Sequence, residues 1–278
     1  MFSGPRSSAR GRLYGRMERA WYLLALPLLA FILLPLVALV LRVPMDRLFA
    51  ILLQREVLLA MRLSLLTSLA SVGLTILAGT PVAYLLAQPG FRLRQVIDTL
   101  VDLPTVLPPA VAGLALLMAL GRRGLLGAWL ADLGISIPFT PTAVILAQAF
   151  VAGPFYVKSA AIGFATIGQD LKQAAALDGA GSWQIFRYLV LPLSWLSIIT
   201  GCAMAWARAL GEFGATIIFA GNFPGRTQTM PLAIYLGFEA NLESALALSF
   251  ILVLLSFVVL ITVKVLLNRN LPQEPIDF

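Results

Sequence analysis

Long apolar stretches alternate with short polar segments along most of the chain. The apolar stretches cover approximately residues 21–41, 61–87, 100–120, 140–162, 190–220 and 244–267. A helix needs about 20 residues to cross the roughly 30 Å hydrocarbon core of a bilayer, and each stretch reaches that length. The pattern therefore predicts an all-α integral membrane protein with six transmembrane helices, in which residues 21–270 form one membrane domain.

The two ends of the chain differ from this domain. Residues 1–20 form a basic segment rich in glycine, serine and arginine, for which we expect no regular structure. The first apolar stretch contains Pro27 and Pro35, and no small-residue cleavage pattern follows it. We therefore interpret it as an uncleaved span and not as a signal peptide. Residues 271–278 are expected to form a short tail.

Lysine and arginine residues predict the orientation of the spans. The N-terminal segment holds Arg6, Arg10, Arg12, Arg16 and Arg19. Cytoplasmic segments of membrane proteins carry an excess of such residues, so we expect this segment in the cytoplasm. Six spans then return the C-terminal end to the same side, together with the polar segment at about 166–192. This topology also assigns Lys158 and Lys172 to cytoplasmic segments and places residues 121–138 and 221–243 outside.

Composition supports a membrane protein. Apolar residues make up 60% of the 278 and charged residues 12%, and the mean hydropathy is +0.92. Soluble domains carry roughly 25% charged residues. The net charge of +7 then indicates cationic loops against anionic membrane lipid and not a nucleic-acid partner.

Several kinds of chemistry are excluded by the residues present. The chain has no histidine, which excludes a histidine metal site or proton relay, and Cys202 is its single cysteine. No glycine-rich nucleotide-binding loop with lysine is found, so we do not expect this chain to hydrolyse ATP. We expect no catalytic residue, no metal and no cofactor in the chain itself.

The polar segment between the fourth and fifth stretches has a helical pattern with one clear interruption. Gly179 predicts the end of a first short helix, because glycine tolerates the left-handed conformation that follows many helices. Ser182 can cap a second short helix that carries Trp183 and Phe186. Ala174 and Ala175 would let a partner surface approach closely. The alternative is a helix pair that packs under its own bundle.

Two of the apolar stretches contain unusual polar or backbone features. Arg208 and Glu212 are four residues apart, on one face of the predicted fifth helix. They form either a structural ion pair or part of an anion path. Pro104, Pro108 and Pro109 interrupt the start of the third stretch. They indicate either a kinked helix or a flexible element beside a path. The candidates for a translocation path are Thr105, Pro108, Pro109, Arg208, Glu212 and Thr216.

A further polar element follows the third stretch. Gly121-Arg122-Arg123-Gly124 is expected on the outer side. It is either a solvated turn or a contact for an anion or an acidic docking protein.

The segment from Gln173 to Pro192 resembles the EAA loop of permease subunits of bacterial ABC importers. That loop reads Glu-Ala-Ala, three residues, Gly, nine residues, Ile, one residue, Leu-Pro. Gln173 replaces the glutamate and Leu189 replaces the isoleucine, while the spacing is intact. The resemblance implies the type I importer fold and a cytoplasmic coupling loop. The residues it assigns to ATPase coupling are Gln173, Ala174, Ala175, Asp178, Gly179, Leu191 and Pro192.

Within these permeases the chain is most similar to the molybdate group. Leu107-Pro108-Pro109 and Gly121-Arg122-Arg123-Gly124 favour that group, whereas residues 208–214 are similar also to sulfate and thiosulfate permeases. The resemblance implies a homodimer in the bacterial or archaeal cytoplasmic membrane. It also implies two ATPase subunits, which bind ATP and Mg, and an extracytoplasmic oxyanion-binding protein. The mechanism it implies is alternating access.

Other functions remain open on the sequence. A sulfate, thiosulfate or tungstate permease would share nearly every feature. An ion-coupled secondary transporter should carry several carboxylates within its spans, and only Glu212 qualifies. A membrane scaffold without transport activity would have no reason to keep the spacing of the coupling loop.

Overall fold

The computed structural model describes residues 7–270, and it describes side chains over residues 21–266. Every regular element in this part of the chain is a helix, so the expected all-α class is confirmed. The chain divides into two compact units, one up to Leu48 and one from Phe49 onward. The expected tail at 271–278 and the side chains of the basic segment at 1–20 lie outside the described residues.

The first unit contains one long helix, α1 (Ser7–Arg42). Its part Trp21–Arg42 is long and apolar enough to cross a membrane, as the sequence predicts. The helix begins at Ser7, so the expectation of no regular structure over the first 20 residues is wrong from Ser7 onward. An established helix propagates at little cost through residues of good helix propensity such as arginine and methionine, and this explains the extension.

The second unit is built on three long helices, α3 (Arg55–Leu86), α7 (Pro141–Ala165) and α14 (Leu242–Asn270). Two further candidate spans are bent pairs. Helix α4 (Arg94–Val106) meets α5 (Pro109–Leu120) at 115°, and the segment Ser182–Leu193 meets α11 (Trp195–Leu210) at 72°. Within the described residues of both units there are four candidate spans, or up to six if each bent pair is one span.

Two of the predicted spans are therefore not single helices. The stretch 100–120 bends between Val106 and Pro109, where two consecutive prolines supply no backbone donor. The stretch 190–220 is divided into α10 (Leu191–Leu193), α11 and α12 (Gly214–Ala220). The division between α11 and α12 falls at a segment with glycine on either side, the residue of poorest helix propensity after proline.

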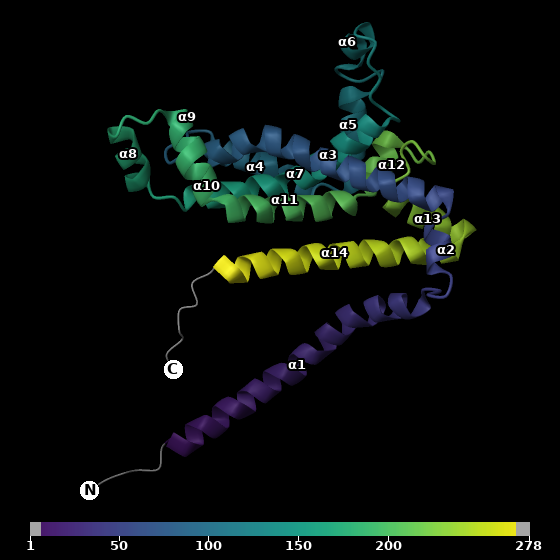
Figure 1. Cartoon of the computed structure of the whole chain (residues 1–278), viewed down its shortest axis with the longest axis horizontal. Coiled ribbons are helices and arrows are strands. Elements are labelled where there is room, and N and C mark those ends of the chain that lie inside the picture. Colours follow the sequence, from purple (N-terminus) through teal and green to yellow (C-terminus); the bar gives the residue numbers. More distant parts are fainter. Residues whose placement is uncertain (1–6, 271–278) are drawn as a thin grey trace. The chain divides into compact units, whose positions relative to one another are not determined.

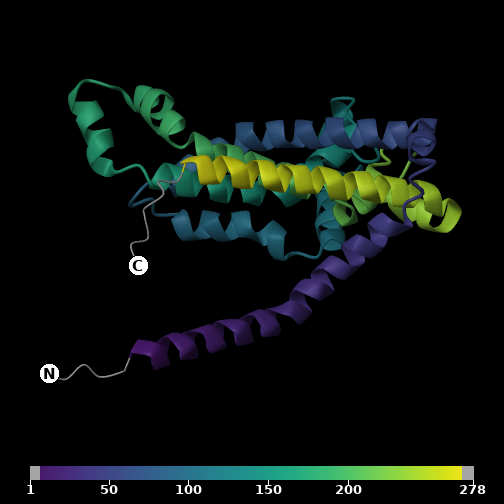
Figure 2. The same cartoon turned by 60° about the horizontal axis from the view of Figure 1, so that its bottom comes forward.

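The long helices of the second unit share one direction, and the short helices lie at their two ends (Figure 1). Helices α3, α4, α7, α11 and α14 run side by side, and Figure 2 shows the same arrangement from a second side. One end holds α8 (Gln169–Leu177), α9 (Ser182–Ile185) and the π-helix η1 (Phe186–Val190). The other end holds α13 (Met230–Ala240), while α6 (Gly127–Asp132) follows α5 and projects from the side of the bundle. The short helix α2 (Leu48–Leu52) spans the point in the sequence at which the second unit begins.

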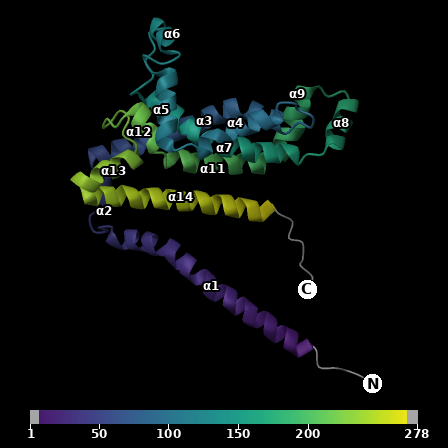
Figure 3. The same ribbon diagram turned by 180° about the vertical axis from the view of Figure 1, so that it is seen from behind.

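The expected topology keeps residues 121–138 and 221–243 on the side opposite the segment 166–192. Helix α13, within residues 221–243, lies at the end opposite α8 and α9, as Figure 3 shows from behind. Helix α14 ends on the side of α8 and α9.

Helix α7 is central to the core of this unit. One cluster of buried apolar side chains joins α7 to α3 and α11, and a second joins it to α5 and α12. Small residues let the helices approach closely. A Cβ atom at Gly163 would lie 2.4 Å from the Cβ of Ser197, and one at Gly201 would lie 2.9 Å from the Cβ of Ser159.

Candidate functional site

The loop predicted to couple to an ATPase contains the turn expected at Gly179. Gly179 has φ +88°, in the left-handed region. Its backbone N–H donates to the carbonyl of Ala176 at 3.0 Å, and the N–H of Ala180 donates to that of Ala175 at 3.0 Å. This pair of hydrogen bonds is the Schellman arrangement that closes a helix. The prediction of a helix stop at Gly179 is confirmed.

The start of the next helix differs from the expectation. Residue Gly181, and not Ser182, occupies the cap of α9. Its backbone N–H donates to Oε1 of Gln184 at 2.8 Å. A glutamine three residues after the cap can reach back to that N–H, which is the half of a capping box that needs no side chain on the cap itself.

Large apolar side chains of this loop face outward. Leu177 is 89% exposed, Trp183 67% and Tyr188 72%. Tyr188 lines a cavity of about 400 Å³ together with Ala175, Asp178 and Gly179. Exposed apolar side chains of this kind are typical of a surface that contacts another molecule.

The residues assigned to coupling share this accessibility. Within α8 and its turn, Gln173, Ala174, Asp178 and Gly179 are exposed and Ala175 is half-buried. At the start of α10, Leu191 and Pro192 are exposed as well.

The second half of the loop is anchored to the bundle by aromatic side chains. The ring of Phe186 packs edge-on against Tyr84 at the end of α3, with centroids 5.1 Å apart, and against Phe164 at the end of α7, at 5.9 Å. Lys172 of α8 is buried, and its Nζ donates to the carbonyl of Phe164 at 3.4 Å. Burial lowers the pKa of Lys172 below its usual value. These contacts join the loop to the ends of α3 and α7.

A second candidate site lies where α11 is interrupted. Arg208 Nη1 and Glu212 Oε2 are 2.8 Å apart, so the expected pair forms. The pair does not lie on one continuous helix, because α11 ends at Leu210. Glu212 is only 1% exposed, and its Oε1 accepts a hydrogen bond from the backbone N–H of Ala215 at 2.8 Å. The carboxylate therefore also holds the first turn of α12.

The break in α11 meets the bend between α4 and α5. A Cβ atom at Gly214 would lie 2.6 Å from the Cβ of Pro109, and one at Gly113 would lie 2.6 Å from the carbonyl oxygen of Ala215. The starts of α5 and α12 are thus in direct contact, and only glycine fits at these two positions without a shift.

The structure brings most of the path candidates to this junction. Pro108 and Pro109 begin α5, and Arg208, Glu212 and the buried Thr216 flank the break. Thr105 stays on α4, where its hydroxyl donates to the carbonyl of Asp102 at 2.7 Å. The sequence predicted the polar residues of the junction but not their meeting, because the contact joins segments a hundred positions apart.

One charged cluster was missed. Lys158 lies inside α7 and not in a cytoplasmic loop as expected. Its Nζ reaches Asp98 Oδ1 at 2.5 Å and Asp102 Oδ2 at 2.8 Å, both on α4. The i,i+4 spacing of the two aspartates was a signal in the sequence, but their lysine partner could not be inferred without the α4–α7 register.

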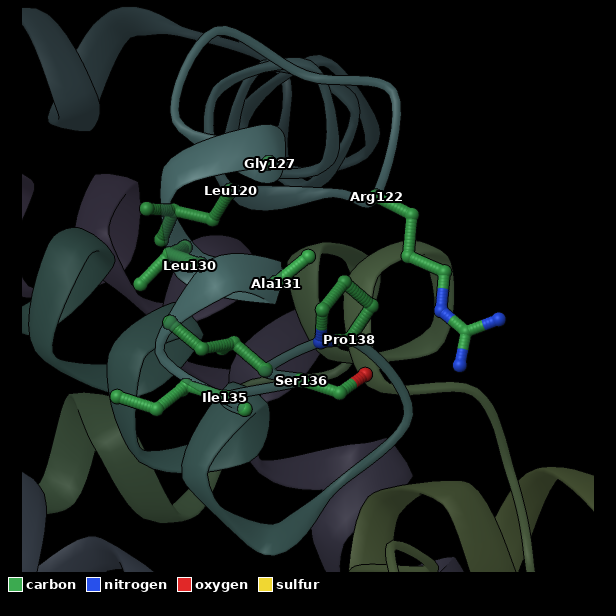
Figure 4. A pocket seen from close by; sticks show the side chains of 10 residues that line it. Leu120, Arg122, Gly127, Leu130, Ala131, Ile135, Ser136 and Pro138 are labelled. Carbon is green, nitrogen blue, oxygen red and sulfur yellow. The ribbon is translucent and has the colours of Figure 1, made fainter.

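The paired arginines that follow α5 form a turn. The N–H of Gly124 donates to the carbonyl of Gly121 at 2.8 Å, and Arg122 and Arg123 are exposed. A pocket of about 430 Å³ lies beside this turn, between the end of α5 and α6. Figure 4 shows that the Arg122 guanidinium extends away from the apolar side chains of Leu120, Leu130 and Ile135. The turn is confirmed, while a contact of these arginines with an anion or an acidic docking protein stays a prediction.

The comparison with known families matches this geometry. Residues 76–271 match the model of the binding-protein-dependent transport system inner membrane component. The chain belongs to that family. Its members are permease components of importers, so the family role of this chain is that of the membrane component and not of an enzyme.

The individual proteins to which the chain is similar are also transport permeases. The chain is 42% identical to the molybdenum transport system permease protein ModB of Mycobacterium tuberculosis, over 89% of this chain and 94% of that protein. It is 41% identical to the ModB of Escherichia coli K12, over 63% of this chain and 77% of that protein. It is also 36% identical to the sulfate transport system permease protein CysW of Synechococcus elongatus, over 68% and 67%.

Solved structures show the same fold at low sequence identity. A bacterial ABC transporter that imports the acidic polysaccharide alginate matches with a TM-score of 0.64 and 19% identity, over 93% of this chain and 98% of that chain. The methionine ABC transporter MetNI matches with a TM-score of 0.58 and 17% identity, over 76% and 94%. The type I importer permease fold expected from the sequence is thereby confirmed.

Proposed function

We propose that this chain is the transmembrane subunit of an ATP-driven importer for molybdate. The observation that carries the proposal is the 42% identity to a molybdenum permease over nearly the full length of both proteins. The proposed working unit contains two copies of the chain, two ATPase subunits that bind ATP and Mg, and an extracytoplasmic binding protein. The exposed face of α8 and α9 supports docking of the ATPase. The chain would lie in the cytoplasmic membrane with both termini inside.

The contacts of the loop suggest how docking drives transport. A partner that moves α8 and α9 displaces Phe186, which pushes on the ends of α3 and α7. Helix α7 packs also on α5 and α12, so the displacement reaches the junction of the two broken spans. Backbone breaks at membrane depth are tolerated where protein or a cavity surrounds them. The junction is the proposed gate of the anion path.

The charges at this gate should let an anion pass without binding it tightly. Arg208 is 31% exposed and its charge is balanced by buried Glu212. A balanced pair offers hydrogen-bond donors to an oxyanion without a full positive charge that would trap it. Such a path separates molybdate poorly from tungstate, so we expect tungstate to be accepted and the binding protein to provide most of the selectivity.

Sulfate is the second candidate substrate, because a sulfate permease is also a relative at 36% identity. Uptake of labelled anion into proteoliposomes that hold the complex, its own binding protein and internal ATP separates the two. We expect molybdate uptake that tungstate inhibits and that equal sulfate leaves nearly unchanged. Sulfate uptake that outcompetes molybdate at equal concentration would establish the sulfate function instead.

A further inference from the structure

Gln148 is an anomaly in the middle of α7. Its side chain is 0% exposed, yet neither its amide nitrogen nor its amide oxygen has a hydrogen-bond partner within the described part of the chain. Buried polar groups in folded proteins are nearly always satisfied. Burial of an amide without a hydrogen-bond partner costs free energy. A leucine or methionine would fill this position without that cost. The glutamine therefore indicates a function that needs its amide.

The register of the helices places Gln148 at the proposed gate. Gly163 lies against Ser194 and Ser197, and Gly201 lies against Ser159. Helices α7 and α11 are therefore antiparallel, and the same register brings Gln148 level with the end of α11 at Leu210. Its neighbours Val144, Ala147 and Val151 pack in one cluster with Ala215 and Phe219 of α12. Gln148 thus lies on the face of α7 that turns toward the break between α11 and α12.

A second polar atom at the break is also buried without a hydrogen-bond partner in the described part of the chain. Thr216 is 0% exposed, and its Oγ1 lacks a hydrogen-bond partner among the described residues. Thr216 is in the first turn of α12, which Glu212 holds through the N–H of Ala215. An amide NH₂ group brings two donors and a hydroxyl brings one. Several uncommitted hydrogen-bonding groups therefore converge on the break from two helices, next to a charge pair that is already balanced.

We propose that Gln148, together with Thr216, binds the oxyanion transiently as it passes the break between α11 and α12. A tetrahedral oxyanion presents only acceptor oxygens, and neutral N–H and O–H donors bind it without neutralising its charge. Such a contact is strong enough to replace water and weak enough to release the anion. In the present conformation both side chains are buried, as a closed gate requires. When α12 moves away from α7, the same groups line the opening.

The inference rests on the proposed function and is tested in the same proteoliposomes with labelled molybdate. Gln148→Leu removes the uncommitted amide, so the complex should assemble and melt at an equal or higher temperature while uptake falls at least tenfold. Gln148→Glu keeps the size but replaces the donors by an acceptor, and uptake should fall at least as far. Thr216→Val should lower uptake several-fold.

Ser71→Ala provides a matched control. Ser71 is equally buried and its hydroxyl is equally without a partner among the described residues, but it belongs to α3 and not to the helices that form the break. We expect uptake by Ser71→Ala to stay within twofold of the unsubstituted complex. Equal losses in the Ser71 and Gln148 variants would show a general packing effect and overturn the inference.

Two further results separate a failure of this inference from a failure of the proposed function. Normal uptake by an assembled Gln148→Leu or Gln148→Glu complex would show that transport does not need the amide, and the inference would be wrong while the importer function stands. Absence of molybdate uptake by the unsubstituted complex would instead refute the proposed function itself.

Discussion

Glu212 is a carboxylate that is almost fully removed from solvent and holds two donors, the guanidinium of Arg208 and the backbone N–H of Ala215. Arg208 is less buried than Glu212. Loss of the ion pair therefore costs more free energy when Glu212 remains than when Arg208 remains. Removal of one partner of a buried pair costs on the order of 3–5 kcal/mol, because the remaining charge is uncompensated. The cost should be greatest when Glu212 is the residue left behind.

We therefore predict that Arg208→Ala lowers the thermal stability of the purified complex more than Arg208→Ala combined with Glu212→Gln. The glutamine keeps an acceptor for Ala215 and removes the buried charge. Melting temperatures of the two variants in detergent check this. If both variants assemble and melt like the unsubstituted protein but lose transport, the pair serves the anion path and not the architecture.

Individual residues also show how much of the structure the sequence can predict. Gly179 could be predicted because only local backbone geometry decides its role, and its φ of +88° bears this out. The cap of α9 was placed one residue late, since Ser182 and Gly181 are both plausible caps and Gln184 favours the latter. Gln148 went unnoticed because the apolar pattern of α7 does not reveal which face is buried against which helix.

Among the elements, α4 contacts the bundle partly through charged side chains. None of its side chains is fully buried, and its charged face meets α7 through Lys158, Asp98 and Asp102. Lys158 is one third exposed and the two carboxylates are nearly half exposed. Each partly exposed pair is worth about 1 kcal/mol or less. These two pairs add to the packing of Ile97 and Val101 against the buried core.

Lys158→Met should loosen α4, because two carboxylates four residues apart would then repel each other without a counter-charge. We expect a loss of stability of ~1 kcal/mol, within the range for such pairs. The melting temperature should recover when Asp98→Asn and Asp102→Asn are added, and Lys158→Arg should resemble the unsubstituted protein. No recovery in the triple variant would show that Lys158 acts through packing and not through charge.

The elements themselves were only partly predictable. Length and hydropathy were enough to place α3, α7 and α14. The prolines at 104, 108 and 109 predicted an interruption, but not that α5 would turn by 115° to pack on α12. That turn depends on the close contact of Gly113 and Gly214 with the partner helix, which is a tertiary feature.

At the scale of the whole molecule, the account requires the two ends of the second unit to face opposite sides of the membrane. Ser182 begins α9 and Ser136 follows α6, and both side chains are exposed. In a background with Cys202→Ser, a cysteine at position 182 should react with an impermeant thiol reagent only from the cytoplasmic side. A cysteine at position 136 should react only from outside. Labelling of position 182 from outside would invert the proposed topology.

The central claim is that α8 and α9 couple this chain to an ATPase, and retention of the ATPase tests it most directly. Gly179→Glu forces a side chain into the left-handed region, at a cost of roughly 1–2 kcal/mol, and adds a charge to the docking face. Gly168→Glu is the matched control, since Gly168 lies in the same segment with φ −54° and open space around its Cβ position. Copurification of the ATPase with the tagged chain should be lost in Gly179→Glu and kept in Gly168→Glu, with both variants folded. An ATPase that stays bound and is stimulated normally in Gly179→Glu, or one that never binds the unsubstituted chain, would contradict the account.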